Sequence, residues 1–423
     1  MTLFKTTLWT GLSTLIKIII SCFTWKVIAV YTGPFGVAVI EQFQNFLQIC
    51  RSLSSSLSQG VVKYIAEYKY DEEKKSKILS SAFIFYFVIS ITVTFFLILF
   101  SKVIAEKVFS SFAYQKTIVI LAISITLFTL NTLLLSVLNG ELEIKKYVFS
   151  NITNTLLTFI ITIYLIMQHG IQGGVIGFSL NQSVSLFLTL YFVIQSKWFK
   201  LNSYLNGIDK ESIIKLTKFA MISFVPILFV PISLMISRQC IAHELSWQQA
   251  GYWQAIMRLS DSYLILMELM INVYFIPKLS GIKLLSDFKE EVINSYRLII
   301  PVVFLGLSFI FLFKKSIVTI LYSEEFFPIL TLFKYQIIGD MARIGTWLLG
   351  SIMAAKAMIK TLVFSEISFS FSYVFFIIFF VHYFGLIGTS IAFAINSIIH
   401  FLFLSFFTVK YIKDGSFQLQ RAI

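Results

Sequence analysis

Charged residues are scarce in this chain. They make up 13% of its 423 residues, while 57% are hydrophobic and the mean hydropathy is +0.85. A soluble domain cannot bury so much apolar surface, so the composition excludes a cytosolic enzyme. Alternating segments of about ten residues, the pattern of a transmembrane barrel, are absent as well. Apolar runs of twenty or more residues recur instead, and they predict a polytopic helical membrane protein.

Motifs for metal binding and for nucleotide hydrolysis are also lacking. The three cysteines and four histidines are scattered at no metal-like spacing, which favours buried cysteines over a metal site. No G-x-x-x-x-G-K-[ST] loop occurs, which excludes ATP hydrolysis by that route. The longest outer loop, near 102–116, is too short for a soluble domain. We therefore expect no catalytic residue, no metal and no cofactor, and we place the function inside the membrane.

Hydropathy predicts twelve membrane-spanning segments and hence an all-α polytopic fold. The segments are expected at about 8–32, 36–66, 78–101, 117–140, 146–168, 172–196, 213–238, 247–277, 292–313, 328–355, 361–383 and 385–409.

The net charge of +13 is explained by topology rather than by nucleic-acid binding. With the N-terminus inside, twenty Lys and Arg residues fall in cytoplasmic stretches and five fall on the outer side. This bias predicts that both termini are cytoplasmic.

An internal repeat predicts the architecture. Shifting the chain by 215 residues places 133–153 on 348–368 and 170–181 on 385–396, with matches such as Ser136 with Ser351 and Gly170 with Gly385. Each half contains six predicted helices, so the halves run in the same direction and should be related by a two-fold axis along the membrane normal. We expect lobes at 1–196 and 213–423 joined by a cytoplasmic linker at 197–212, with a site between the lobes, as in alternating-access carriers.

Polar stripes follow helical spacing on four of the predicted segments. An ionisable side chain facing lipid costs several kcal/mol, so these stripes should face a wet cavity or a partner. Counted over the membrane, basic residues exceed acids, and a cationic cavity with amides suits an anionic, hydroxyl-rich solute such as a phosphate-linked sugar. The stripes include Lys17 and Lys26, then Glu41, Gln44, Gln48 and Arg51, then Gln254, Arg258, Asp261 and Glu268, and then Gln336, Asp340 and Arg343.

A structural role is the alternative for several of these residues. Arg258 with Asp261, and Asp340 with Arg343, are spaced three apart and could form ion pairs that only stabilise their helices. Arg238, near a segment end, could extend to the headgroups instead.

Several motifs resemble the Wzx family of lipid-linked oligosaccharide flippases. They are LWTGLSTLIK (8–17), YTGPFG (31–36), GVVKYIAEY (60–68), WQQAGYWQAIMRLSDSYL (247–264), YQIIGDMARIGTWLLG (335–350) and AAKA (354–357). The resemblance covers nearly the whole chain in order. It implies the MATE-like fold of the multidrug/oligosaccharidyl-lipid/polysaccharide exporter superfamily. It also implies movement of undecaprenyl-pyrophosphate-linked glycan from the inner to the outer leaflet of the bacterial inner membrane, in exchange for protons or other cations.

The resemblance also implies site residues and partners. Lys17, Lys26, Arg51, Arg258 and Arg343 are expected to meet the pyrophosphate, and Gln44, Gln48 and Gln254 to complete the substrate site. Asp340, Asp261 and Glu268 are the candidate ion-coupling carboxylates. Membrane lipids and proteins of polysaccharide assembly are further candidate partners, and an AT-rich residue bias favours an O-antigen unit as the glycan.

Three other functions are weighed against this one. A multidrug/cation antiporter of the same superfamily would favour an acidic cavity. A membrane glycan polymerase or ligase usually carries a large periplasmic loop, which this chain lacks. A structural protein would not need charged stripes on four helices.

Overall fold

The computed structural model describes residues 3–180, 183–204, 206–271, 275–282, 285–356 and 358–413. Throughout these ranges the secondary structure is helical, and the chain separates into two compact units, Met1–Ile232 and Ser233–Ile423. Each unit is considered by itself below.

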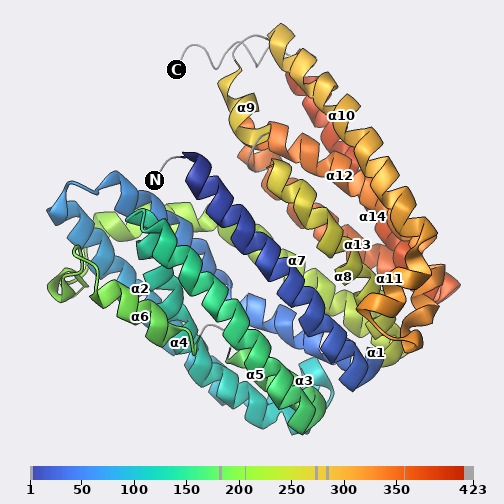
Figure 1. The fold of residues 1–423 in the computed structure, drawn as a ribbon, viewed down its shortest axis with the longest axis horizontal. Helices are drawn as coiled ribbons and strands as arrows, with labels where there is room; N and C mark the ends of the chain where they lie inside the picture. Colours follow the sequence, from blue (N-terminus) through green and yellow to red (C-terminus); the bar gives the residue numbers. More distant parts are fainter. Residues whose placement is uncertain are drawn as a thin grey trace. The chain divides into compact units, whose positions relative to one another are not determined.

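Unit 1 contains the elements α1 (Leu3–Glu67), α2 (Glu72–Leu99), α3 (Ser101–Phe109), η1 (Phe112–Tyr114), α4 (Gln115–Gly140), α5 (Ile144–Ser179), α6 (Leu186–Ile194) and η2 (Leu201–Tyr204) (Figure 1). Helix α7 (Lys210–Glu244) begins in unit 1 and ends in unit 2. Unit 2 continues with α8 (Trp247–Met270), α9 (Ile276–Gly281), α10 (Leu285–Leu312), α11 (Lys314–Leu321), η4 (Glu324–Thr331), α12 (Phe333–Ala355), α13 (Ile359–Phe384) and α14 (Leu386–Lys413).

All twelve predicted membrane segments fall on these helices. By length and composition, seven of the described helices could cross a bilayer. Helix α1 is 65 residues long, roughly 98 Å at 1.5 Å per residue, far more than the roughly 30 Å of a bilayer core. Its backbone leaves helical geometry at Gly33 (φ 62°), so α1 comprises two of the predicted segments.

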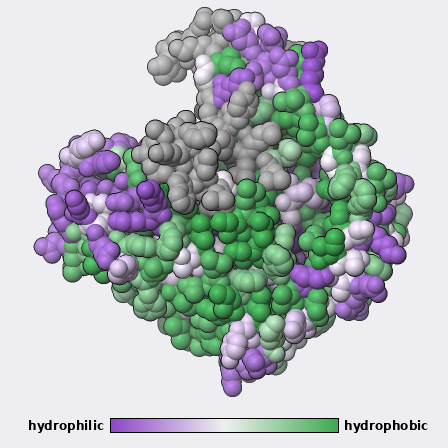
Figure 2. Space-filling view, in the orientation of Figure 1, coloured by the Kyte–Doolittle hydropathy of each residue, from purple (hydrophilic) through white to green (hydrophobic). Residues whose placement is uncertain are grey.

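The expected all-helical membrane fold is therefore confirmed, and large apolar side chains cover much of its surface. Figure 2 shows hydrophobic residues over wide areas, with hydrophilic residues gathered in separate patches. In α10, Leu298, Leu305 and Leu312 are each more than two-thirds exposed. An exposed apolar face of this kind suits contact with lipid.

The internal repeat is confirmed by the backbone. Gly170 (φ 55°, ψ −132°) interrupts α5, and Gly385, 215 residues later, has nearly the same angles (φ 57°, ψ −139°) at the end of α13. A Cβ on Gly173 would lie 1.9 Å from the carbonyl oxygen of Leu165, and one on Gly388 would lie 2.0 Å from that of Phe380. Both copies thus need glycine at the same two places in the bend.

Helices α4 and α12 occupy corresponding central places in the two units. Helix α4 contacts α1, α2, α5 and α6, whereas α12 contacts α8, α9, α10, α13 and α14. The helix after each of them begins in the same way. The amide of Glu143 donates to the carbonyl of Leu138 at 2.9 Å, and that of Met358 donates to Met353 at 2.8 Å. Residues of α4 can therefore be compared with residues 215 positions later in α12.

Polar contacts fix the ends of the helices in unit 1. Lys75 of α2 forms a buried ion pair with Glu141 at 3.0 Å, just beyond the end of α4. The hydroxyl and the amide of Ser212 both donate to Oδ2 of Asp209, at 2.6 and 2.8 Å. These hydrogen bonds lower the pKa of the Asp209 carboxyl and stabilise the start of α7.

The start of α7 packs within unit 1. Leu216 and Ala220 belong to the same buried cluster as Leu57, Val61 and Ile65 of α1. The compact unit therefore extends to residue 232, beyond the linker expected at 197–212. The division into two six-helix lobes joined at that linker remains a prediction.

The repeated bend gives a first testable prediction. Gly388→Ala should destabilise the protein by about 1–3 kcal/mol, because the new Cβ would overlap a backbone carbonyl that must shift. The melting temperature of the purified protein in detergent measures this loss. Gly306→Ala in α10 is the matched control, because a Cβ there meets nothing within 4 Å. Equal melting temperatures for both variants would contradict the described bend.

Candidate functional site

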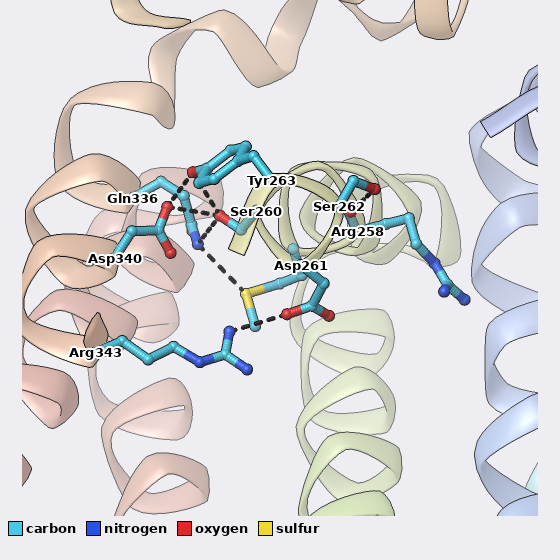
Figure 3. Close-up of polar contacts among 9 residues, drawn as sticks. Arg258, Ser260, Asp261, Ser262, Tyr263, Gln336, Asp340 and Arg343 are labelled. Atoms are coloured by element: carbon cyan, nitrogen blue, oxygen red, sulfur yellow. Dashed lines mark hydrogen bonds and ion pairs between the residues drawn. The ribbon is translucent and has the colours of Figure 1, made fainter. Parts of the chain in front are cut away.

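The buried carboxylate of Asp340 lies at the centre of a polar cluster between α8 and α12 (Figure 3). Asp340 is 0% exposed. Its Oδ2 accepts hydrogen bonds from the hydroxyls of Ser260, at 2.7 Å, and Tyr263. The side-chain amide of Gln336 donates to the same Ser260 hydroxyl at 2.9 Å. Oδ1 of Asp340 and Oε1 of Gln336 are buried without a hydrogen-bond partner in the described part of the chain.

Unit 1 provides an internal comparison for this cluster. Gln336, Asp340 and Arg343 of α12 correspond to Leu121, Ile125 and Phe128 of α4. All three residues of α4 are buried, so the same packing position accepts purely apolar side chains. The fold therefore does not require a carboxylate there. A buried polar group that the fold does not need is a candidate for function.

The ion pairs suggested by spacing within one helix are replaced by a pair between helices. Arg343 of α12 donates through Nη1 to Oδ1 of Asp261 of α8 at 3.0 Å. The guanidinium also lies over the rings of Trp347, 5.0 Å from its centroid, and Phe393, 6.0 Å away. The alternative of an Asp340–Arg343 pair was wrong, because the described partners of Asp340 are hydroxyls. Residues three apart point away from each other here, since each helix turns its partners toward a neighbouring helix.

Arg258 lies on another side of α8 from Asp340. Figure 3 shows its guanidinium pointing away from both Asp340 and Arg343. The third predicted coupling residue, Glu268, has a side chain outside those described. The structure thus brings together Asp261 and Arg343 and places Asp340 beside them, while the roles expected for Arg258 and Glu268 remain predictions.

Gln254 is bound within the protein rather than open to a ligand. Its Oε1 accepts from Nη2 of Arg238 at 2.5 Å, and the guanidinium lies 5.4 Å from the ring centroid of Trp253. The indole of Trp253 in turn donates to the hydroxyl of Tyr373 at 3.1 Å. Arg238 is 0% exposed, so the expectation that it extends to the headgroups was wrong. This network stabilises the packing of α7, α8 and α13.

The predicted basic residue of the second membrane segment is also buried. The Arg51 guanidinium lies over Phe128, with Cζ 3.9 Å from the ring centroid. Its Nε and Nη2 have no hydrogen-bond partner among the described residues, and the same holds for Nε2 of Gln44. Gln48 is exposed on the same helix, and Lys17 and Lys26 lie, partly buried, in the first half of α1. Unpartnered N–H groups of this kind can bind an anion or a ligand oxygen.

The two units also differ where their second and fourth helices meet. In unit 1, Thr94 of α2 donates to the carbonyl of Ala122 at 2.7 Å and lies 3.2 Å from the Thr126 hydroxyl, which joins α2 to α4. In unit 2, a cavity of about 820 Å³ lies between α10, α12 and α14. Leu307, Ile337 and Met341 line it, at the positions corresponding to the three residues of unit 1. Its apolar lining suits a hydrocarbon chain rather than a sugar.

Some parts of the site were not predicted from the sequence. Ser260 and Tyr263, which hold Asp340, were not singled out, although their spacing of three places them on one face of α8. Trp253 and Tyr373 were missed as well. In both cases the partner lies on a different helix, and one sequence does not show which helices pack together.

The described site has features of known transport proteins. A family profile described as "Polysaccharide biosynthesis protein" matches residues 3–283. The chain belongs to this family. The Wzx-like resemblance of the sequence is therefore confirmed.

Curated relatives and solved structures agree with this membership. The chain is 24% identical over 404 residues to the "Lipid III flippase" of Escherichia coli (strain K12) and to that of Shigella flexneri, covering 95% of this chain and 97% of each relative. Its fold is similar to a multidrug resistance MATE family transporter of the MOP superfamily in an inward-facing conformation, with 12% identity, 94% of both chains covered and a TM-score of 0.83. A MOP superfamily transporter from Pyrococcus furiosus matches with 14% identity, 97% and 96% coverage and a TM-score of 0.70.

These similarities confirm the MATE-like fold and the class of protein. The chain is a multi-pass membrane protein of a transporter family and not an enzyme. The polymerase or ligase alternative is thereby excluded. At this identity the solved structures show the fold alone.

The comparison of Asp340 with Ile125 gives a second prediction. Asp340→Asn should leave the melting temperature in detergent unchanged or raise it, because it removes a carboxylate that costs free energy to bury. Ser260→Ala should instead lower stability by about 1 kcal/mol, because it removes a donor to Asp340 and the acceptor of Gln336. A large loss of stability in Asp340→Asn would identify Asp340 as a structural residue.

Proposed function

We propose that this protein is a flippase for undecaprenyl-pyrophosphate-linked oligosaccharide. It would move the lipid from the inner to the outer leaflet of the bacterial cytoplasmic membrane, with both termini in the cytoplasm. The main support is the match to the flippases of Escherichia coli and Shigella flexneri over nearly the full length of both chains. Buried basic groups at Arg51 and Arg343 support an anionic substrate, whereas a drug/cation antiporter would favour an acidic cavity.

In this proposal the pyrophosphate binds the basic groups of the stripes and the glycan occupies a wet cavity between the two lobes. Arg51 is the best-supported anion ligand, because two of its nitrogens are buried and unpartnered among the described residues. A guanidinium with two free N–H groups is suited to phosphate oxygens. Arg343 is a second candidate, although Asp261 already neutralises part of its charge. Lys17, Lys26 and Arg258 complete the proposed basic set.

Asp340 is the best-supported coupling carboxylate. The described structure shows no basic side chain bonded to it, and one of its oxygens has no partner. A proton or another cation could therefore bind there with little competition. Asp261 is less suitable, because its side chain is 52% exposed and already paired with Arg343. Binding of the cation at Asp340 would bias the alternating-access equilibrium and reset the carrier.

Deletion of the gene in its native host tests the proposed function. Complete lipid-linked units should accumulate in extracted lipid while the surface polysaccharide is lost, and the sugars of those units would identify the glycan. We propose an O-antigen unit. Normal surface glycan with altered drug or dye sensitivity would contradict the flippase function and favour the antiporter.

Charge reversal tests the basic groups in the same deletion strain. Arg51→Glu and Arg258→Glu should each abolish complementation, because a buried negative charge repels pyrophosphate. Lys315→Glu is the control, because Lys315 lies in α11 outside the proposed site. Surface glycan on gels and the amount of protein in the membrane are measured together. Full complementation by both arginine variants would remove these arginines from the site.

Asp340→Asn tests coupling in the deletion strain. The variant should reach the membrane in wild-type amounts but restore roughly a tenth or less of the surface glycan, because an amide cannot exchange a proton. Asp261→Asn should retain more activity, since its exposed pair with Arg343 is worth about 1 kcal/mol or less. Wild-type glycan levels with Asp340→Asn would exclude Asp340 as the coupling residue.

A further inference from the structure

The serines of α1 in the second membrane segment divide into two groups. Ser52, Ser54 and Ser56 are buried, and each hydroxyl donates to the backbone carbonyl three residues earlier, at 2.7–2.9 Å. Ser55 and Ser58 are only half-buried, and the described part of the chain provides no hydrogen-bond partner for either hydroxyl. The spacing of three places these two hydroxyls on one face of the helix.

That face borders a polar cavity of about 200 Å³ inside unit 1, between α1, α4 and α5. Asn139 of α4 and Tyr147 of α5 also line it. Among the described residues neither the Asn139 amide nor the Tyr147 hydroxyl has a side-chain partner, whereas the Asn151 amide donates to a backbone carbonyl. Four neutral polar groups from three helices therefore converge with unused hydrogen-bonding capacity.

The chemistry of the lining distinguishes between possible ligands. Phosphate only accepts hydrogen bonds and favours cationic donors, whereas these hydroxyl and amide groups both donate and accept. Sugar hydroxyls have the same dual character. The volume is below the roughly 300–1,000 Å³ of pockets that enclose a drug-sized ligand. The cavity therefore suits one sugar ring rather than an entire oligosaccharide.

Arg51 fixes which sugar this would be. It lies one helical turn before Ser55, and side chains four apart have Cβ atoms roughly 5–6 Å from each other. The Arg51 guanidinium also lies on Phe128, a residue of the cavity wall. An anion bound to Arg51 would thus be next to a ring bound by Ser55 and Ser58.

We propose that this cavity is a subsite for the first sugar of the lipid-linked glycan, the ring joined directly to the pyrophosphate, and that Arg51 binds the adjoining phosphate. This inference rests on the proposed function and makes it more specific. The subsite would make the protein select its substrate by the first sugar.

Binding to the purified full-length protein tests the subsite. The probes are undecaprenyl-pyrophosphate-linked monosaccharide and undecaprenyl pyrophosphate without sugar, in detergent micelles. The double variant Ser55→Ala/Ser58→Ala should bind the sugar-bearing lipid about tenfold more weakly, since it loses two hydrogen bonds. Its affinity for the sugarless lipid should be unchanged. Tyr147→Phe, which removes one oxygen atom, should show a smaller loss of the same kind.

Ser52→Ala/Ser56→Ala is the matched control, because it makes the same change in the same helix at hydroxyls bonded to their own backbone. It should bind both lipids like the wild type. Unchanged affinity of the Ser55/Ser58 and Tyr147 variants for the sugar-bearing lipid would overturn the subsite while leaving the flippase function intact. A wild-type protein that binds neither lipid would overturn the proposed function, and the subsite with it.

Discussion

A buried polar group inside a membrane-spanning helix needs a partner, because no water replaces its lost hydrogen bonds. Most polar side chains in the described helices meet this need locally, as Ser52 and Ser56 do by bonding to their own backbone. Others meet it across helices, as Arg343 does with Asp261. Against this background the exceptions are informative. Asp340, Gln336 and Arg51 each keep a buried atom without a partner among the described residues.

The internal duplication shows that these exceptions are not demands of the fold. Two units with the same bend at Gly170 and Gly385 tolerate Ile125 in one and Asp340 in the other. They also tolerate a closed junction at Thr94 and an open apolar cavity at Leu307. In the proposed mechanism, unit 1 contributes the Arg51 anion site and the sugar subsite, and unit 2 contributes the coupling carboxylate. Duplication supplies the scaffold, and divergence of its copies supplies the chemistry.

The sequence predicted the features that depend on one helix or on the repeat. Hydrophobic length placed all twelve segments, and the offset of 215 residues found the paired glycines before their backbone angles were known. Contacts between helices were less accessible. The stripe in α8 correctly included Asp261 but suggested Arg258 as its partner, whereas Arg343 of α12 is in contact. Spacing specifies which face a residue occupies, but packing decides which helix lies against that face.

Transport by purified protein in liposomes tests the central claim most directly. Wild-type protein and Asp340→Asn would be reconstituted with lipid-linked oligosaccharide, and its appearance in the opposite leaflet would be followed with and without an imposed proton or sodium gradient. The account predicts gradient-stimulated movement by the wild type and slow, gradient-independent movement by the variant. Equal stimulation of both proteins, or no movement of the lipid by the wild type, would contradict it.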